Sequence, residues 1–288
     1  MPELPEVEVV KKSLQKYILN LTIENIEIRN KSLRYDINYK MFKKMIKSKI
    51  SSIKRRSKYL LINLDNDYTI LIHLGMTGKI IIISSNNTKN KSSFYYDLKD
   101  FNHDHDHLII NFTKNIKIIY NDIRKFGFIK IIKTPKIFLS SHLKNLGPEP
   151  FSKKFNLDYF KSKIKKRKII LKDLLMSQKF LSGLGNIYVN EVIFMSKLNP
   201  RIKVKKLLNK NILSLIQNIR KVLRKAIKQG GSSVKNFNNI KGQKGKFQEF
   251  LCVYGREGKS CIRSKCPGKI KAIRISNRST FYCSICQK

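Results

Sequence analysis

The feature that most constrains the fold of this chain is the spacing of cysteines near its C-terminus. Four of the five cysteines lie after residue 260, in two pairs that sixteen residues separate. The first pair is spaced C-x4-C and the second C-x2-C. Four thiolates at such spacings are typical of a structural zinc site of the zinc-ribbon kind, which leaves no open position for catalysis. The sequence therefore predicts one structural Zn²⁺ bound by Cys261, Cys266, Cys283 and Cys286.

The residues between the two cysteine pairs predict a β-hairpin that carries this site. Segments 270–275 and 279–282 can form its strands, with Asn277 and Arg278 at the tip. Cys252 stands alone, and we expect it to pack rather than to bind metal. Cysteines used as metal ligands, rather than as a disulfide framework, indicate a reducing compartment.

The charge of the chain favours a polyanionic partner. Its 288 residues carry a net charge of +42, and nucleic acid is the first partner to consider for such a protein. The chain is also rich in Lys, Ile and Asn, as an A/T-biased genome would make it, so lysine alone is weak evidence for binding. The bias explains arginine less easily, and we give more weight to Arg124, Arg167, Arg274 and Arg278.

Two absences bear on the location of the protein. No apolar run reaches the roughly 18 residues that a membrane span needs. The N-terminus also lacks the basic-then-apolar order of a secretory signal. We therefore expect a cytoplasmic protein with no membrane partner.

The first half of the chain predicts a β-sandwich or barrel, with helices only at its start and edges. Short apolar or alternating segments follow one another with polar turns between them, which is typical of antiparallel strands. The expected strands are 21–29, 50–53, 59–64, 68–74, 79–83, 108–112, 116–120 and 126–132. The expected helices are 5–18, where Pro5 begins the first turn, and 41–46. A polar loop is expected at 84–100.

Two turns in this half carry large side chains between glycines. The first, 73–78, holds Met76, and the second, 120–127, holds Arg124 and Phe126. A Met or Phe on a turn most often folds back into the core. In a basic protein, the alternative is a wedge that enters a base stack with an arginine beside it.

The second half of the chain predicts helices after a linker. Segment 133–155 is rich in turn residues, and helical periodicity starts at residue 156. A glycine turn precedes a helix that would begin at Asn186, where unpaired backbone N–H groups suit a phosphate, although a tight interhelical turn needs the same glycines. A long amphipathic helix is expected at 207–229, followed by a polar, flexible segment.

The N-terminus itself is a candidate for chemistry. If Met1 is removed, Pro2 becomes a free secondary amine, and a terminal amine of pKa about 8 is partly neutral at pH 7. Such an amine can form a Schiff base, with Glu3 placed to move protons. The plainer interpretation, that Pro5 and the following glutamates only begin a helix, leaves Pro2 and Glu3 without a role.

Together these pieces resemble one family over essentially the whole chain, the formamidopyrimidine-DNA glycosylases, bacterial enzymes that excise oxidised purines such as 8-oxoguanine. The motifs that carry the resemblance are, in order, MPELPEVE, RRSKYLL, HLGMTG, HDH, NDIRKFG, HLKNLGPEP, GLGNIYVNE, QGGSS, VYGREG and NRSTFYCSICQK. The resemblance implies an α+β multidomain fold with a helix–two-turn–helix domain. Its expected parts are a β-sandwich domain (1–134), a linker (135–155), the helix–two-turn–helix domain (156–230), a flexible base-contacting loop (231–252) and a zinc finger (253–288).

The resemblance also implies a role for each matching residue. Pro2 would attack the sugar C1′ of a flipped nucleotide, and Glu3 would assist ring opening and base loss as a proton donor. Lys58 would be the proton donor for β-elimination, and Arg278 would serve δ-elimination. Met76, Arg124 and Phe126 would fill the space left by the extruded base, and further DNA contacts would come from His73, His105, Arg167 and Asn186. The resemblance implies a monomer that acts on double-stranded DNA with oxidised purines or abasic sites, without any metal at the HDH motif.

The sequence departs from the family pattern at several positions. The first cysteine pair is wider than the usual C-x2-C, although the wider spacing still allows zinc. Ile123 and Lys125 replace a Pro and an Arg beside Arg124, and lysine cannot bind phosphate as a fork. Lys246 stands where an aromatic residue is common in the base-contacting loop, which affects lesion preference most.

Two other functions fit part of the same pattern. A non-catalytic zinc-ribbon nucleic-acid-binding protein would show the same charge and cysteines, but would not need Pro2, Glu3, Lys58 and Arg278. A glycosylase of the related endonuclease VIII branch would act on oxidised pyrimidines, but Leu4 and the Met76, Arg124 and Phe126 set favour the purine branch.

Overall fold

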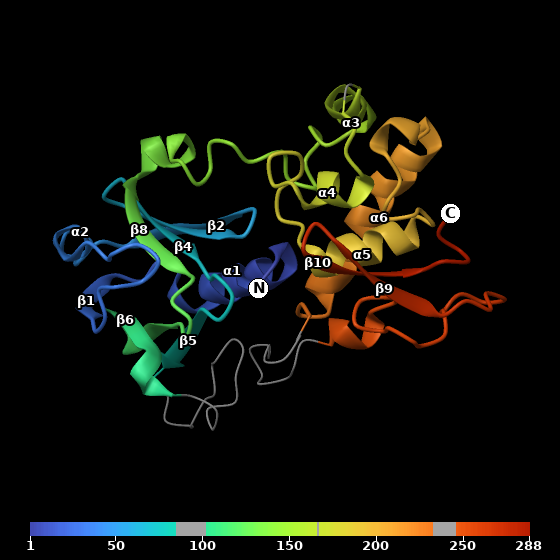
Figure 1. Ribbon diagram of the computed structural model, residues 1–288. Helices are drawn as coiled ribbons and strands as arrows, with labels where there is room; N and C mark the ends of the chain where they lie inside the picture. Colours follow the sequence, from blue (N-terminus) through green and yellow to red (C-terminus); the bar gives the residue numbers. More distant parts are fainter. Residues whose placement is uncertain (85–101, 166, 233–245) are drawn as a thin grey trace. The chain divides into compact units, whose positions relative to one another are not determined.

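The computed structural model describes residues 1–84, 102–165, 167–232 and 246–288. The chain packs into two units (Figure 1). We call Met1–Lys144 with Ile227–Gln248 the N-terminal unit, and Asn145–Ala226 with Glu249–Lys288 the C-terminal unit. The first division lies within the expected linker, which forms a 3-10 helix, η3, at Thr134–Leu139. Among the described residues, no helix is long and apolar enough to cross a membrane.

The N-terminal unit is a sandwich of two antiparallel four-stranded sheets, as the sequence predicts. One sheet has the order β1-β6-β7-β5 and the other β2-β3-β4-β8. Alternating residues of both sheets point into one shared core of Ile, Leu and Phe side chains. The strands are β1 (Ile23–Ile28), β2 (Ile50–Arg56), β3 (Tyr59–Leu64), β4 (Tyr68–His73), β5 (Lys79–Ser84), β6 (Asp106–Phe112), β7 (Ile116–Asn121) and β8 (Phe128–Lys133).

Helix α1 (Leu4–Ile18) closes one side of this sandwich and packs against β2 (Figure 1). Its apolar stripe, from Val7 to Ile18, is buried in the sandwich core. The predicted second helix lies earlier than expected, as α2 (Tyr39–Lys43), because the Asn38 side chain accepts the Met41 N–H and begins the helix there. The expected loop at 84–100 falls almost wholly outside the described residues.

The C-terminal unit combines short helices with one hairpin. Its helices are α3 (Leu157–Ile164), α4 (Leu171–Met176), α5 (Asn186–Met195) and the 3-10 helix η4 (Val204–Lys206), followed by α6 (Asn209–Lys228), which runs two residues beyond the unit. Its strands are β9 (Ile270–Ile275) and β10 (Arg278–Cys283). Helix α5 packs against both α4 and β10, so the hairpin rests on the helical part.

The tip of this hairpin lies one residue earlier than the sequence predicts. Ser276 and Asn277 form the turn, and Arg278 is already the first residue of β10, paired with Ile275. Both turn residues have positive φ, 47° and 59°, as the preferred two-residue hairpin turns require. Arg278 therefore has a fixed strand backbone rather than the freedom of a turn residue.

Candidate active site and metal centre

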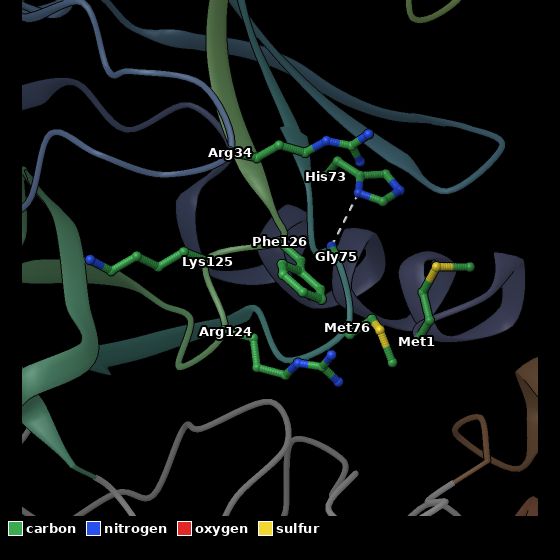
Figure 2. Close-up of a pocket in the computed structure, with 8 residues that line it drawn as sticks. All are labelled: Met1, Arg34, His73, Gly75, Met76, Arg124, Lys125 and Phe126. Carbon is green, nitrogen blue, oxygen red and sulfur yellow. Dashed lines mark hydrogen bonds between the residues drawn. The ribbon is translucent and has the colours of Figure 1, made fainter.

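A pocket of about 600 Å³ opens on the N-terminal unit beside the start of the chain. Figure 2 shows the side chains that line it, which come from the terminus and from several separate turns. Four of the predicted DNA-contact residues, His73, Met76, Arg124 and Phe126, are among them. The lining residues are Met1, Arg34, His73, Gly75, Met76, Arg124, Lys125 and Phe126.

The two turns that line the pocket are fastened to each other by Asp122. One oxygen of this fully buried carboxylate accepts the Thr77 hydroxyl, and the other accepts the Gly127 N–H at 2.8 Å. The Arg124 N–H then donates to the Thr77 hydroxyl at 3.1 Å. Gly75 sits so close to the other turn that a Cβ on it would meet the Gly127 nitrogen at 2.4 Å. The two turns therefore form one rigid platform.

This platform presents Met76 and Phe126 to solvent instead of folding them into the core. Their exposed fractions are 44% and 46%. The Arg124 guanidinium lies 4.5 Å from the centre of the Phe126 ring, which holds the two side chains together by a cation–π contact. Two large apolar side chains and a cation exposed on one rigid platform are what a base-stack wedge requires.

The residues that follow Met1 are buried beside this platform. Pro2 is buried and Glu3 is only 3% exposed, and Glu3 forms a reciprocal capping box with Glu6 at the start of α1. Burial lowers the pKa of the terminal amine of Met1 below its usual 8.0. Glu3 and Glu6 oppose this shift, whereas the charges of Lys58 and Arg124 add to it, so all four groups face the terminus.

Lys58 and His73 supply polar groups around the same place. Lys58 is 6% exposed and lies in the turn between β2 and β3. The His73 Nδ1 accepts the Gly75 N–H at 3.1 Å, and the ring stacks on Phe128 (Figure 2 draws the hydrogen bond). Burial first, then the Lys58 and Arg34 charges, lower the pKa of His73 to about 4. His73 is therefore a neutral ring near pH 7, and its Nε2–H remains as a donor.

His105 is tied to the wedge platform through the backbone. It ends the short 3-10 helix η2 (His103–His105), and its carbonyl accepts the Asp122 N–H at 3.1 Å. His107 is buried and its Nε2 lies 2.8 Å from the Asp122 carbonyl oxygen, which gives it a structural role. The HDH motif thus supports the turn that carries Arg124.

The remaining predicted DNA contacts lie in the C-terminal unit. Asn186 begins α5 as predicted, but its side-chain amide donates to the Ser279 carbonyl at 3.0 Å. The buried ammonium of Lys172 donates to the same carbonyl, also at 3.0 Å, and to the Thr280 hydroxyl. Burial, followed by the Arg278 charge, lowers the pKa of Lys172 to about 8. Two donors thus hold the backbone next to Arg278, whose side chain is exposed.

Arg167 lies apart from these residues in the sequence, just after α3, and its side chain is exposed. Its backbone N–H donates to the carbonyl of Ile164, the last residue of that helix, at 3.0 Å. Its charge also acts on the neighbouring Tyr159 hydroxyl.

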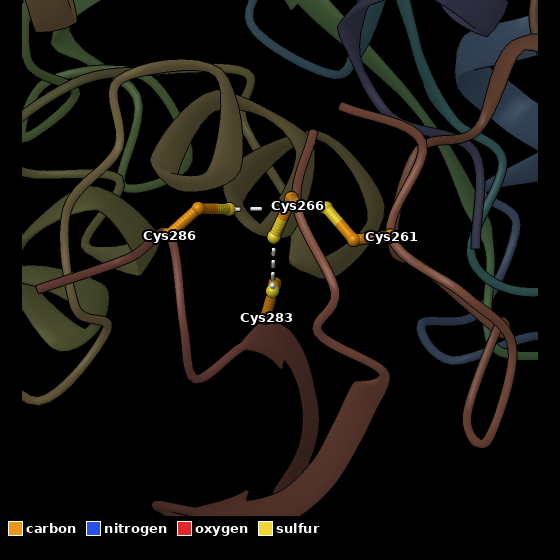
Figure 3. A group of neighbouring side chains, drawn as sticks. All are labelled: Cys261, Cys266, Cys283 and Cys286. Carbon is orange, nitrogen blue, oxygen red and sulfur yellow. Dashed lines mark hydrogen bonds between the residues drawn. The ribbon is translucent and has the colours of Figure 1, made fainter. Parts of the chain in front are cut away.

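The four cysteines of the predicted zinc site come together at the base of the hairpin (Figure 3). All four Sγ atoms lie within 4.8 Å of one another, with 3.8 Å between Cys261 and Cys286 and 3.6 Å between Cys266 and Cys283. Four thiolates at the Zn–S distance of about 2.3 Å, arranged as a tetrahedron, lie roughly 3.8 Å apart. The donor set and its spacing therefore fit a structural metal ion, and Cys252 is outside the cluster.

Three residues of these sites carried too weak a sequence signal to be singled out. Arg34 lines the pocket, and as an arginine in a lysine-rich chain it could have been weighted with the others. Asp122 was visible only as one residue of a turn, and Lys172 as one of many lysines. Their roles depend on contacts between distant parts of the chain.

Comparisons with known proteins agree with this fold. The family model of the formamidopyrimidine-DNA glycosylase N-terminal domain matches residues 1–129, and that of the H2TH domain of the same enzymes matches residues 146–238. The formamidopyrimidine-DNA glycosylase of Rickettsia conorii is 39% identical over 287 residues, which cover 100% of this chain and 99% of the relative. That of Rickettsia felis is 40% identical over 288 residues, covering 100% and 98%.

Solved structures of the same family are also similar to this chain. The complex between Lactococcus lactis Fpg and a DNA containing an abasic site aligns with a TM-score of 0.84 and 34% identity, over 99% of each chain. A Lactococcus lactis Fpg mutant in complex with a Fapy-dG containing DNA aligns with a TM-score of 0.85 and 34% identity, over 100% of each chain. Fold and site thus define a DNA glycosylase with a helix–two-turn–helix domain. Within that class, the chain belongs to the formamidopyrimidine-DNA glycosylase family.

Proposed function

We propose that this chain excises oxidised purines, 8-oxoguanine and formamidopyrimidines, from double-stranded DNA and then cleaves the abasic site. The observation that carries the proposal is the burial of Pro2 beside the buried Glu3 and Lys58 and an exposed wedge. Burial disfavours the charged form of an amine, so it increases the neutral, nucleophilic fraction of an amine at this position near pH 7. The DNA complexes of the Lactococcus lactis relatives support the substrate class.

The proposed chemistry starts when removal of Met1 leaves Pro2 as a secondary amine. The nitrogen lone pair attacks the sugar C1′, the bond from C1′ to the base breaks with its electrons leaving on the base, and Glu3 supplies the proton that assists base loss. Glu3, now a carboxylate, takes the proton of the attached nitrogen and passes it to the ring oxygen O4′ as the C1′–O4′ bond breaks, which opens the sugar and leaves an iminium at C1′. The iminium makes the C2′ hydrogen acidic, so that its loss breaks the 3′ C–O bond by β-elimination, with Lys58 as proton donor. Arg278 serves the second elimination, which breaks the 5′ C–O bond.

The remaining residues have binding roles in this proposal. Met76, Phe126 and Arg124 occupy the space that the flipped nucleotide leaves, which offsets part of the few kcal/mol that extrusion costs. His73, as a neutral N–H donor, and His105, Arg167 and Asn186 contact the DNA. The net charge of +42 supplies nonspecific affinity, so binding should weaken steeply as salt increases.

The proposed metal of the cysteine cluster is Zn²⁺, held by all four thiolates in a structural role. The spacing of the four Sγ atoms supports this ion, which prefers tetrahedral thiolate sites. Thiolate ligands also support the bacterial cytoplasm, a reducing compartment, as the location.

Borohydride trapping tests the proposed function. Borohydride reduces an imine between protein and DNA to a stable bond, so the wild-type chain should form a covalent complex with an 8-oxoguanine:cytosine duplex and with an abasic duplex. The matched control is the same chain with an N-terminal extension that blocks Pro2, which should bind DNA without trapping. A wild-type chain with free Pro2 that binds both duplexes but traps neither would contradict the proposal. Comparing the excision of thymine glycol with that of 8-oxoguanine distinguishes the pyrimidine branch from the purine branch.

A further inference from the structure

The carboxylate of Glu6 is shared between two parts of the N-terminal unit that are 226 residues apart in the sequence. One oxygen, Oε2, accepts the Glu3 N–H at 2.8 Å. The other, Oε1, accepts the Ser232 N–H at 2.8 Å and the Ser232 hydroxyl at 3.2 Å. Glu6 is only 2% exposed, so these bonds form away from competing water.

The backbone before Ser232 is shaped to reach this carboxylate. Gly231 has a φ of +85°, which an L side chain rarely adopts, and a Cβ on it would lie 3.0 Å from Glu6 Oε1 and 3.1 Å from Glu6 Cγ. Glycine is therefore required at this position for two reasons: its positive φ and the close approach of the backbone to the Glu6 side chain.

The same short stretch begins residues 231–252, to which the family resemblance assigns base contact. Ser232 pairs with Lys246 in an antiparallel bridge, and the Phe247 N–H donates to the Gly231 carbonyl at 3.2 Å. The described residues on either side of 233–245 thus meet at the backbone that Glu6 holds. The other oxygen of Glu6 holds Glu3, next to Pro2.

We propose that Glu6 is a positioning residue that couples the backbone at Gly231 and Ser232 to the catalytic terminus, so that removal of a damaged base depends on it more than cleavage of an abasic site does. The inference rests on the proposed function. Both reactions need the terminal amine in place. Only the removal of a damaged base also needs that base to be held while the amine attacks. A residue that merely starts α1 would affect both reactions equally.

Two substitutions separate these roles. In Glu6→Gln, the side-chain amide keeps one acceptor and cannot accept both backbone N–H groups. Gly231→Ala leaves Glu6 intact and disturbs its contact from the other side, by placing a Cβ against the carboxylate and straining the 231–232 backbone. Each should reduce the single-turnover rate of 8-oxoguanine excision by roughly 10- to 100-fold and that of cleavage at a preformed abasic site by less than about 3-fold.

A control and a combination complete the experiment. Gly258→Ala places alanine at a similar φ of +78° where a Cβ meets nothing within 4 Å, so it should leave both rates unchanged. The Glu6→Gln, Gly231→Ala double variant should excise 8-oxoguanine no more slowly than the slower single variant, because both changes break the same contact. Equal losses in both reactions, or losses that multiply in the double variant, would overturn the proposal.

The double-mutant cycle is also measured by thermal unfolding, which needs no activity. Coupling between Glu6→Gln and Gly231→Ala in the unfolding midpoint is expected even if the wild-type chain traps no DNA. Absence of that coupling contradicts the contact itself, whereas a failed trapping experiment with intact coupling contradicts only the proposed function.

Discussion

The two units hold the exposed side chains that we assign to DNA contact by different means. In the N-terminal unit, the turns of Met76 and Phe126 stand on a sandwich with a continuous apolar core. In the C-terminal unit, the strands that carry Arg278 bury few residues of their own, and four thiolates gather at their base. The turns of Met76 and Phe126 should therefore keep their structure after many local substitutions, whereas the hairpin of Arg278 should depend on one metal ion. The comparison leads to four predictions.

Removal of the metal should have the largest effect, and only in the C-terminal unit. Structural zinc contributes about 10–16 kcal/mol of binding free energy in small zinc domains, much more than the apolar contacts of this hairpin can replace. Hydrogen exchange after chelation should show loss of protection in β9 and β10, with β3 and β4 unchanged.

A matched pair of cysteine variants tests the same point. Cys283→Ala should reduce zinc content and DNA affinity together, whereas Cys252→Ala, outside the cluster, should change neither. A hairpin that keeps its protection without metal would show that the two units are held in the same way.

Loss of a wedge side chain should have the next largest effect. Phe126→Ala should slow excision from duplex DNA by roughly 10- to 100-fold, because the extruded base leaves a hole that costs a few kcal/mol when it is unfilled. Excision from single-stranded DNA should change less. Phe138, which is 59% exposed on η3, provides the control: Phe138→Ala should behave as wild type. Equal rates for the two variants would contradict the wedge.

The contact between the two wedge turns should be measurable through Asp122. In Asp122→Asn, an amide nitrogen replaces one carboxylate oxygen and cannot accept an N–H or a hydroxyl. The free energy of unfolding should fall by about 1–3 kcal/mol, as expected when a buried donor loses its acceptor. Asp158→Asn on the surface of α3 is the control, and chemical denaturation is the measurement. An unchanged unfolding midpoint for Asp122→Asn would show that the turns are held by the sandwich alone.

The smallest effect should come from the titration of His73. Its pKa is about 4 in the folded protein and about 6.5 in an unfolded chain, so between these values the unfolded state binds more protons. Stability should therefore fall as pH falls, by up to about 2 kcal/mol between pH 7 and pH 5. His73→Gln cannot titrate and should lose less over the same range. Parallel stability curves for both proteins would contradict a buried, neutral His73.

Much of the fold was predictable because its causes are local. The eight strands follow from short apolar or alternating segments, and they appear within a few residues of their predicted ends. The exceptions have local reasons as well: Asn38 caps α2 earlier than predicted, and positive φ at Ser276 and Asn277 moves the hairpin tip away from Arg278. The cysteine cluster was predictable because metal geometry restricts the spacing of ligands.

By itself, the sequence determined the sandwich, the start of α1 to within one residue (Leu4, where Pro5 was expected) and the four-cysteine site. Only the tertiary structure decided that Met76 and Phe126 stay exposed, since the buried Asp122 that fastens their turns bonds to a residue 45 positions away. In the same way, only the fold gave Lys172 its contact with Ser279 and Glu6 its contact with Ser232, which join residues 107 and 226 positions apart. A buried charge can take any partner that the fold brings to it, and the sequence pattern around the charge does not specify which.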